Sequence, residues 1–567
     1  MRRSWGAWAV GIALVGAVAC SGGSGDDDDA GGASAAGGSG GGPAGAAGPA
    51  EWVSLGNDLA NSRAATGEHT IGPDNVADLA PAWELADAKG VTGTPVVADG
   101  VVYIGDWTGT VHALDAATGE EQWATQVASY YIGGSVAVDD DRVYVGAFDA
   151  RMVALDRTTG EKLWETPIGD HAQAVIFGSP VEVDGLVIVG VASFELMTGN
   201  AAPTFRGHLV ALDAETGEEQ WRWWATEADD TAGPGVSIWS SPAVDTERGV
   251  VYIGTGNTYT APPAPKADAL VALDLETGEE QWVTQFTVGD TWTLTAPAGS
   301  DSDVGAPPNL FTVGDTDAVG VADKAGSYHA VDRDSGELLW ETELTEGGLQ
   351  GGVLAGAAVA DGAVFVASNR ASTDADLLSL DAETGDVDWR LDLEGHVSGP
   401  VSWANGVVYV SDDSGRIAAY DAAGGDRLWT YATDAPAAGG IAVVDGTVYA
   451  GWGWWFTSAP PDAKGGMIAF RLDGEAAPAD DEAGRDDEAA ASGEDVYGEN
   501  CARCHGEDGQ GGSGPSMEGV ADRLTEDEHV EVVRNGRAGM PAWKDTLSDD
   551  EIAAVVEYER TVLSEGG

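Results

Sequence analysis

An internal repeat constrains the fold of this 567-residue chain more than any other feature. Each copy is an apolar segment, an Asp-x-x-Thr/Ser-Gly turn and a second segment that ends in tryptophan, except that Gly425 of the last copy follows a glycine. In such a turn the glycine takes a positive φ, and the aspartate accepts hydrogen bonds from the turn backbone. The clearest copies end at Trp123, Trp164, Trp221 and Trp282, and weaker copies end at Trp340, Trp389 and Trp429.

Each copy follows a pair of alternating segments joined by Asp-Gly, as in residues 94–105, which indicates two more strands. Four short strands in a repeat of roughly 40 to 60 residues are typical of a β-propeller blade. Trp83 ends an incomplete first copy, which the strand at residues 467–472 completes by closing the ring. We therefore predict an all-β, eight-bladed β-propeller and interpret the tryptophans as wedges between blades, not as a redox chain.

A second motif, Cys501-Ala-Arg-Cys504-His505, predicts a covalent haem c. The two thiols add to the haem vinyl groups and the histidine binds the iron, whereas the alternative, a redox dithiol, needs no histidine. Met540 is the expected second axial ligand, a thioether that raises the reduction potential. Met517 is the other candidate, and we interpret it as a packing residue.

The N-terminus predicts export. A basic start, an apolar segment at residues 8–16 and the small residues before Cys20 form a signal peptide. Ala-Val-Ala-Cys20 resembles a bacterial lipobox, although Ala17 stands where leucine is usual. We therefore expect a lipidated Cys20 and a periplasmic or cell-surface protein anchored to a membrane. Ordinary secretion with an incidental cysteine is the alternative.

Composition divides the chain and limits its partners. With 95 Asp+Glu against 27 Lys+Arg, the formal net charge is −68, which excludes binding to the phosphates of nucleic acids. We interpret this charge as a solvated surface. The signal peptide (1–20) precedes a Gly/Ala/Ser-rich linker (21–50), and an acidic linker (474–492) joins the propeller (51–473) to residues 493–567. This last segment resembles a small all-α class I cytochrome c.

The repeats over about residues 51–472 resemble the pyrroloquinoline-quinone (PQQ)-dependent alcohol dehydrogenases. Residues 52–63, Trp-Val-Ser-Leu-Gly-Asn-Asp-Leu-Ala-Asn-Ser-Arg, look like that family's first-blade signature. Residues 190–195 and 303–311 suggest the polyvinyl alcohol dehydrogenase branch. The resemblance implies PQQ and Ca²⁺ as cofactors and an alcohol as substrate, secondary or polymeric by the branch. Electrons would pass through haem c to an external acceptor, a cytochrome or a respiratory-chain component.

The resemblance also implies site residues. The chemistry needs a cation that polarises the quinone, a carboxylate base and a flat surface for the ring. Glu195 and Asn257 match the family's Ca²⁺ ligands, which suit a hard cation. Trp239 matches the ring-stacking tryptophan.

Two more residues complete the implied site. Asp303 matches the catalytic aspartate, which is also a metal ligand, and Asp301 is the nearby alternative. Lys324 matches a cation beside the quinone oxygens. Taken singly, each of these residues is as well explained by a turn, a solvated face or the core, so the prediction rests on their occurring together and in order.

Several features depart from the family pattern. The chain has no vicinal cysteine pair, and residues 129–135 offer no arginine for a quinone carboxylate. No glutamate stands beside Thr94-Pro95. The aromatic residues at 452–456 either border the pocket or pack blades. Two other functions therefore stay open: a scaffold like the outer-membrane assembly propellers, and a docking platform that keeps the haem.

Overall fold

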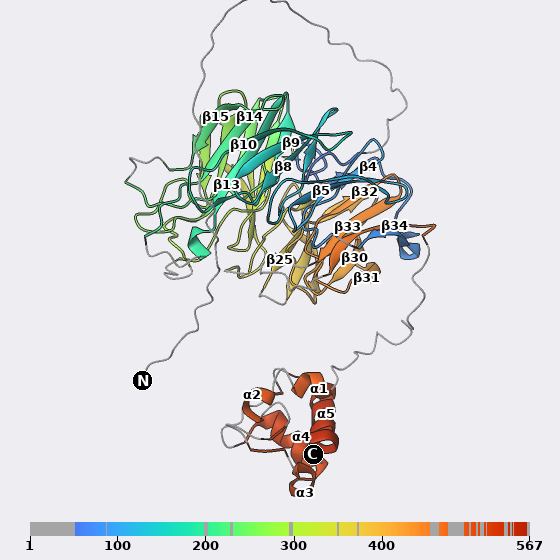
Figure 1. The fold of residues 1–567 in the computed structure, drawn as a ribbon. Coiled ribbons are helices and arrows are strands. Elements are labelled where there is room, and N and C mark those ends of the chain that lie inside the picture. The colour runs from blue at the N-terminus through green and yellow to red at the C-terminus, as the bar shows by residue number, and fades with distance from the viewer. Residues whose placement is uncertain are drawn as a thin grey trace, which may run out of the picture. The chain divides into compact units, whose positions relative to one another are not determined.

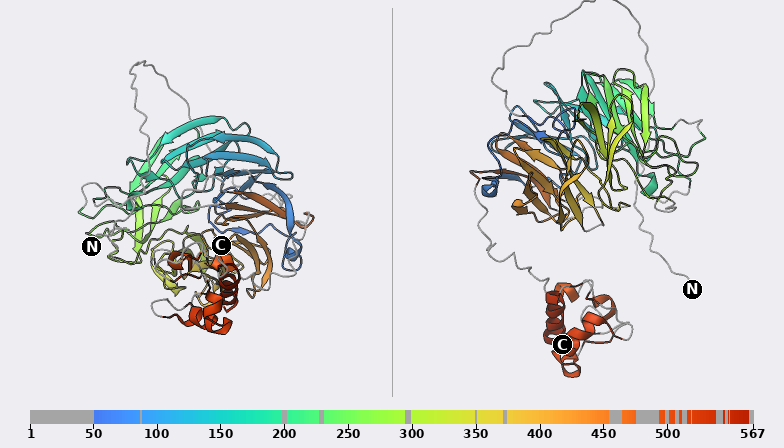
Figure 2. Two further views of the ribbon diagram at one scale, coloured as in Figure 1. Left: turned by 60° about the horizontal axis from the view of Figure 1, so that its bottom comes forward. Right: turned by 180° about the vertical axis from the view of Figure 1, so that it is seen from behind.

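The computed structural model describes most of the chain after residue 50. The described residues are 51–86, 88–197, 202–226, 231–293, 299–348, 351–370, 374–453, 464–474, 493–497, 501–505, 509–510, 515–517, 519–537, 543–544, 547 and 549–563. Their strands form eight sheets, each built on a four-stranded antiparallel meander (Figure 1). Further views show the sheets following one another in chain order (Figure 2). These sheets are the blades of the predicted propeller.

Blades 1 to 4 are numbered in chain order and contain the first four complete copies of the repeat. Blade 1 is β3 (Val96–Ala98), β4 (Val101–Gly105), β5 (Thr110–Asp115) and β6 (Glu121–Gln126). Blade 2 is β7 (Ala137–Val138), β8 (Arg142–Ala147), β9 (Arg151–Asp156) and β10 (Lys162–Pro167). Blade 3 is β12 (Val181–Val183), β13 (Leu186–Ser193), β14 (His208–Asp213) and β15 (Glu219–Trp224), with β11 (Ala174–Val175) added on β13. Blade 4 is β16 (Ala243–Asp245), β17 (Val250–Gly254), β18 (Ala269–Asp274) and β19 (Glu280–Gln285).

Blades 5 to 8 complete the ring. Blade 5 is β20 (Asn309–Val313), β21 (Thr316–Ala322), β22 (Ser327–Asp332) and β23 (Leu338–Glu343). Blade 6 is β24 (Ala358–Ala360), β25 (Ala363–Asn369), β26 (Ala375–Asp381) and β27 (Val387–Leu393). Blade 7 is β28 (Ser402–Ala404), β29 (Val407–Ser411), β30 (Arg416–Asp421) and β31 (Arg427–Ala432). Blade 8 is β32 (Ile441–Val444), β33 (Thr447–Gly453), β34 (Gly465–Arg471) and the N-terminal β2 (Ala80–Leu85).

Blade 8 closes the ring with strands from both ends of the propeller. β2 pairs antiparallel with β34, and Trp83 lies opposite Ala469. The prediction that the incomplete first copy is completed by the last strand is therefore confirmed. Closure of this kind leaves no open sheet edge between the first and last blades.

The repeat tryptophans lie between blades, as predicted. The indole N–H of Trp123 donates to the carbonyl of Arg157 in the next blade at 3.1 Å, and Trp429 donates to Leu79 at 3.0 Å across the closure. A Cβ atom on Gly160 would lie 2.6 Å from the ring of Trp123, so this turn must be glycine both for space and for its φ of 70°. The same indole-to-carbonyl bond is made by Trp83, Trp164, Trp221, Trp282, Trp340 and Trp389.

The segment at residues 52–65 runs along the innermost strands of successive blades instead of forming a blade of its own. Trp52 exchanges main-chain hydrogen bonds with Val97 of blade 1. Leu59 then accepts from Val244 of blade 4, and the segment ends as β1 (Ala64–Ala65), parallel to β28 of blade 7. This segment ties blades together that are far apart in sequence.

Arg63 anchors this inner segment. Its side chain is buried, and it donates through Nε to the carbonyl of Val401 at 2.7 Å and through Nη2 to the hydroxyl of Ser402 at 2.9 Å. Burial lowers the pKa of Arg63 to about 9. The guanidinium thus links the N-terminal segment to blade 7.

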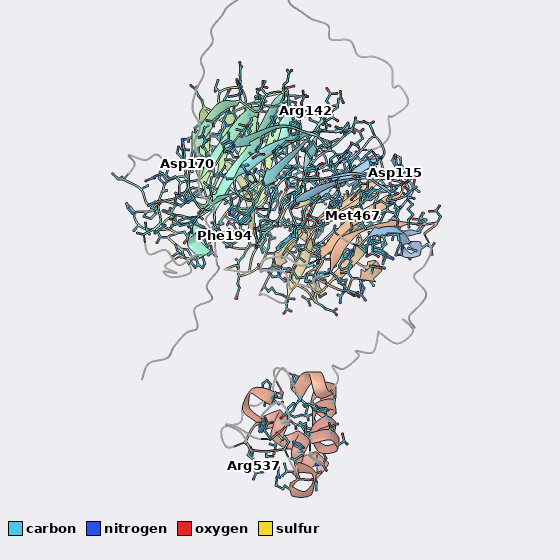
Figure 3. All side chains as sticks on the ribbon, in the orientation of Figure 1. Asp115, Arg142, Asp170, Phe194, Met467 and Arg537 are labelled. Carbon is cyan, nitrogen blue, oxygen red and sulfur yellow. The ribbon has the colours of Figure 1, made fainter. Side chains whose placement is uncertain are left out.

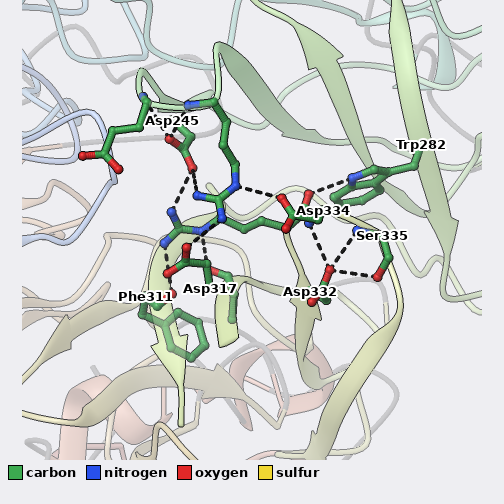
Figure 4. A network of polar contacts seen from close by, with 11 residues as sticks. Asp245, Trp282, Phe311, Asp317, Asp332, Asp334 and Ser335 are labelled. Carbon is green, nitrogen blue, oxygen red and sulfur yellow. Dashed lines mark hydrogen bonds and ion pairs between the residues drawn. The ribbon is translucent and has the colours of Figure 1, made fainter. Parts of the chain in front are cut away.

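A polar network joins blades 4 and 5 at the opposite edge from the candidate site (Figure 4). Asp245 accepts hydrogen bonds from Arg248 at 3.1 Å and from Arg333 at 2.9 Å. Arg248 also contacts Asp317 at 2.7 Å and Asp334 at 2.9 Å. Because these contacts are partly buried and shared, they hold the two blades in register better than isolated surface pairs would.

The secondary structure described within residues 493–563 is helical, with turns and irregular segments between the helices. The elements are α1 (Gly493–Val496), α2 (Ala502–His505), α3 (Val520–Arg523), α4 (Glu526–Asn535), α5 (Asp549–Tyr558) and the π-helical η4 (Glu559–Leu563). Apolar residues of these elements, among them Val533, Ile552 and Val555, form one core cluster. No helix within the described part of the chain is both long and apolar enough to span a membrane.

Candidate active site

The residues expected to bind quinone and metal gather on one edge of three consecutive blades. Glu195, Asn257 and Lys324 each follow the second strand of blades 3, 4 and 5. Trp239 and Asp303 lie in the loops that enter the first strands of blades 4 and 5. In a propeller both kinds of loop lie on the same face. Phe194, beside Glu195, and Arg142, at the start of β8, accordingly mark opposite strand ends (Figure 3).

Asp303 is held by main chain and by an ammonium group. Its Oδ1 accepts from the backbone N–H of Asn257 at 2.5 Å, and its Oδ2 lies 3.4 Å from Nζ of Lys324. The backbone N–H of Lys324 also donates to the carbonyl of Asp303 at 3.0 Å. Only 7% of Asp303 is exposed. The structure thus brings these three predicted residues into direct contact.

Asp301 lies closer to the ammonium than Asp303 does. Nζ of Lys324 is 2.7 Å from Oδ2 of Asp301. Burial, followed by the charge of Asp303, raises the pKa of Asp301 to about 6. Burial alone would lower the pKa of Lys324, but the carboxylates of Asp303 and Asp301 outweigh it and raise the pKa. Lys324 therefore stays an ammonium group between two aspartates.

Asn257 is oriented by the main chain around it. Its Nδ2 donates to the carbonyls of Thr258 at 2.9 Å and Trp292 at 2.8 Å. Since both amide hydrogens are engaged, Oδ1 is the atom that this side chain can offer to a ligand. Trp292 was not identified from the sequence. Its ring lies 6.0 Å from Nζ of Lys324, at the limit of a cation–π contact.

Glu195 is buried and partly engaged by backbone. Its Oε2 accepts from the N–H groups of Thr204 and Phe205, both at 2.8 Å. Its Oε1 lies 3.6 Å from Nε2 of His171.

Tyr259 lies near the carboxylates of Asp303 and Glu195. Its hydroxyl is 2.7 Å from Oγ of Ser237. Burial raises the pKa of Tyr259, and the charges of Asp303 and Glu195 raise it further. No sequence pattern had marked this tyrosine, which stays a neutral phenol beside the charged groups.

Trp239 rests on a glycine. A Cβ atom on Gly305 would lie 1.9 Å from Cη2 and Cζ2 of the Trp239 ring. Only glycine allows the indole to occupy this place beside Asp303. The ring is partly exposed, so it offers a flat apolar surface of the kind that a planar quinone needs.

Carboxylates outnumber cations around the loops that carry Asn257 and Asp303. Asp268 is fully buried, and neither of its carboxyl oxygens has a hydrogen-bond partner in the structure. Burial, followed by the charges of Asp303 and Asp290, raises the pKa of Asp268 to about 10. No three His, Cys, Asp or Glu side chains among the described residues form a metal-binding group. The predicted ligand set has two carboxylates and one amide, and its oxygens suit Ca²⁺ chemically.

In the haem motif, Cys501 directly precedes α2 and His505 is the last residue of that helix. His505 is buried, and its Nδ1 lies 2.7 Å from the carbonyl of Pro515. A carbonyl only accepts, so Nδ1 carries the proton and Nε2 remains for iron. Cys501 is buried in the same core.

The remaining haem calls fall in two groups. Met517 is buried in the apolar cluster of the helices, which agrees with its interpretation as a packing residue. The side chain of Cys504, together with Met540, lies outside the described residues, and so does Cys20.

Comparison with protein families decides the class of the propeller. Residues 52–346, more than half of the chain, match the family described as "Glucose/ethanol/alcohol dehydrogenase, beta-propeller domain", which is a PQQ family. The chain belongs to this family. Residues 488–558 match "Cytochrome C oxidase, cbb3-type, subunit III", so the C-terminal helices are a cytochrome c domain. Residues 324–477 also match "Outer membrane protein assembly factor BamB".

Individual relatives agree with this assignment. A polyvinylalcohol dehydrogenase of Pseudomonas sp. is 28% identical over 416 residues, which cover 65% of this chain and 57% of that protein. The chain thus spans little more than half the length of this relative. A quinohemoprotein alcohol dehydrogenase of Comamonas testosteroni is 26% identical, with 91% of each chain covered.

A solved structure gives the same fold. The crystal structure of the Comamonas testosteroni quinohemoprotein alcohol dehydrogenase superimposes with a TM-score of 0.63 at 23% identity, over 91% of this chain and 95% of that one. The predicted family, the eight-bladed fold and the quinone and haem cofactors of the family are confirmed. The individual site residues remain predictions.

Proposed function

We propose that this protein is a PQQ-dependent alcohol dehydrogenase that passes electrons through its own haem c to an external acceptor. One observation carries the proposal: Asp303 is held between the backbone of Asn257 and the ammonium of Lys324, on the face where Trp239 rests on Gly305. A carboxylate base, a cation and a flat ring surface are the parts that quinone-dependent alcohol oxidation needs.

Ca²⁺ fits the chemistry of the residues present. Carboxylate oxygens of Glu195 and Asp303 and Oδ1 of Asn257 would be its ligands, all of them the oxygens that a hard cation prefers. When bound, the cation and PQQ supply a polarised two-electron acceptor.

The protein's own groups would position and deprotonate the alcohol. Asp303 Oδ1 is occupied by the Asn257 amide, so Oδ2 is the oxygen that accepts the hydroxyl proton. Lys324, whose Nζ lies 3.4 Å from Oδ2 of Asp303, would place positive charge beside the quinone oxygens. Trp239 fixes the plane in which the ring lies.

The haem domain would serve as the one-electron outlet. Cys501 and Cys504 would hold the haem covalently, and His505 and Met540 would ligate its iron. The acidic linker at residues 474–492 keeps this outlet at high effective concentration near the propeller of residues 51–473. When bound, the haem would supply a one-electron path to the external acceptor.

The substrate class and location complete the proposal. The similarity to a polyvinylalcohol dehydrogenase supports a secondary or polymeric alcohol as substrate. The signal-like segment at residues 1–20 supports export, with lipidation at Cys20. Mass spectrometry of the mature N-terminus tests this: a diacylglyceryl-modified cysteine supports the anchor, and an unmodified N-terminus contradicts it.

Haem reduction tests the activity directly. Purified holoprotein receives PQQ and Ca²⁺, and the haem absorbance is followed while primary, secondary and polymeric alcohols are supplied. We expect reduction that requires both additions and is at least about 100-fold slower in Asp303→Asn, because general-base catalysis contributes this much. Asp315→Asn, an exposed aspartate of the β20–β21 turn, is the matched control. Normal rates in Asp303→Asn would contradict the proposal.

A non-catalytic scaffold is the second candidate. The match of residues 324–477 to the outer-membrane assembly factor favours it. The fused haem argues against it, because a scaffold needs no electron outlet. Haem that dithionite reduces but no alcohol does would favour either this scaffold or a docking platform in a respiratory chain.

A further inference from the structure

Six aromatic side chains form a continuous surface on the loops of blades 1 to 3, which we call the aromatic wall. They are Trp107, Tyr130, Tyr131, Phe148, Phe177 and Phe194. The centroids of Trp107 and Tyr131 are 4.7 Å apart with nearly parallel planes. Tyr131 then contacts Phe148 at 4.3 Å, and Phe148 contacts Phe194 at 5.2 Å. Each contact is within the range of direct aromatic packing.

The aromatic wall is not blade core. Tyr130 is 51% exposed, and Trp107, Phe148, Phe177 and Phe194 are partly exposed. None of the six belongs to the apolar clusters that fill the blades in the described part of the chain. Apolar surface that blade packing does not consume indicates a binding surface for an apolar group.

The aromatic wall meets the candidate active site at two points. Phe194 directly precedes Glu195, the expected metal ligand. Phe177 directly precedes Gly178, where a Cβ atom would lie 3.0 Å from the carbonyl oxygen of Trp239. The wall therefore begins beside the groups that would hold metal and quinone, and it ends at the exposed ring of Tyr130.

We propose that the aromatic wall binds the carbon chain of the alcohol while its hydroxyl lies at Asp303. This inference rests on the proposed function and assigns the substrate class: alcohols with an extended, uncharged carbon chain. Methylene groups on aromatic faces leave water, so each buried methylene raises the affinity about fourfold. We expect ethanol and other short alcohols, which have few methylene groups to bury, to gain little from these rings.

The chain-length dependence of turnover tests the assignment. We expect kcat/KM for haem reduction to rise from ethanol to 1-hexanol, with a 1-hexanol to ethanol ratio of roughly 10 or more if two methylenes are buried. The double variant Tyr130→Ala/Phe148→Ala should lower this ratio by about tenfold. Leu163→Ala removes an exposed apolar side chain from β10, an outer strand of blade 2, and should leave the ratio unchanged.

Binding without turnover gives a second readout. Tertiary alcohols carry no hydrogen on the carbinol carbon, so they bind but cannot be oxidised. Isothermal titration of the holoprotein should give tighter binding of 2-methyl-2-hexanol than of tert-butanol, and the double variant should lose the difference. Melting curves and dithionite reduction of the haem verify that the variants are folded.

The two proposals fail in different ways. If no alcohol reduces the haem, the proposed function fails. If alcohols reduce it but the double variant keeps the wild-type ratio and the wild-type preference among tertiary alcohols, the aromatic wall does not bind the chain. A wild-type protein that shows no chain-length preference in either measurement also overturns the inference.

Discussion

The backbone N–H of Asn257 donates to Oδ1 of Asp303, with 2.5 Å between the two heavy atoms. The bond joins a loop of blade 4 to the loop that enters blade 5. It fixes which carboxylate oxygen faces Lys324 and ties the expected metal ligand to the expected base. A shift of either loop would therefore disturb both roles together.

Gly305→Ala should damage the floor under the quinone. The new Cβ would lie 1.9 Å from the Trp239 ring, so the indole must move. We expect a loss of about 1–3 kcal/mol in stability from overpacking and weaker PQQ binding. Thermal unfolding and fluorescence titration with PQQ measure these effects. Gly67→Ala is the control, because nothing lies within 4 Å of that position; equal PQQ affinity in both variants would contradict the role of Gly305.

Asp268→Asn should flatten the pH dependence of stability. The pKa of Asp268 is raised to about 10, whereas an unfolded aspartate titrates near 4. Between these values the folded state holds a proton that the unfolded state lacks, so stability falls as pH rises. Without that proton, Asp268→Asn should gain more than about 1 kcal/mol relative to wild type between pH 5 and pH 9.

Urea unfolding in chelator at three pH values measures this difference. Asp315→Asn, which changes an exposed aspartate, should follow the wild-type curve. Parallel curves for wild type and Asp268→Asn would mean that the buried carboxyl is ionised in the folded protein.

Gly424→Thr should stabilise the propeller. In the turns of blades 1 to 4 the threonine hydroxyl donates to the aspartate, as Thr118 does to Asp115 at 2.9 Å. Blade 7 has Gly424 at this place, and a Cβ there meets nothing within 4 Å. We expect a gain of about 0.5–1 kcal/mol in unfolding free energy. The reverse change Thr118→Gly should cost about 1 kcal/mol, and a gain from both would refute this reasoning.

Met540→Ala should lower the reduction potential of the haem by roughly 100 mV or more, since axial ligation spans about 0.8 V. Met517→Leu should leave the potential unchanged, because Met517 packs in the apolar cluster of the helices. Its cost in stability should stay below about 1.5 kcal/mol, as for other volume-conserving changes. Spectroelectrochemical titration of both variants decides between the two methionines.

The local pattern was sufficient to predict the blades. Asp115, Thr118 and Gly119 form their turn from contacts within five residues, so sequence alone predicts it. The sequence also predicted that the strand of Trp83 pairs with the last strand of the propeller. The incomplete first copy has too few strands to form a blade without a strand from elsewhere. The haem motif is equally local, because Cys501, Cys504 and His505 lie in one short continuous segment of the chain.

The candidate site could be predicted only where a residue type and spacing carried the resemblance, as for Asn257 and Asp303. Trp292 and Gly305 were missed, because one contributes a carbonyl and a ring face and the other the absence of a side chain. Tyr259 was missed because its surroundings include charges that other blades supply.

The sequence by itself determined the strands, turns, wedge tryptophans and haem attachment, because each depends on neighbours in the chain or on a fixed repeat. Only the tertiary structure decided how loops of different blades meet. It placed Lys324 nearer to Asp301 than to Asp303. It also connected Phe194 to Trp107 through the rings of Phe148 and Tyr131. It also placed residues 52–65 along the innermost strands. Contacts between distant segments depend on packing and charge in three dimensions, which no local pattern encodes.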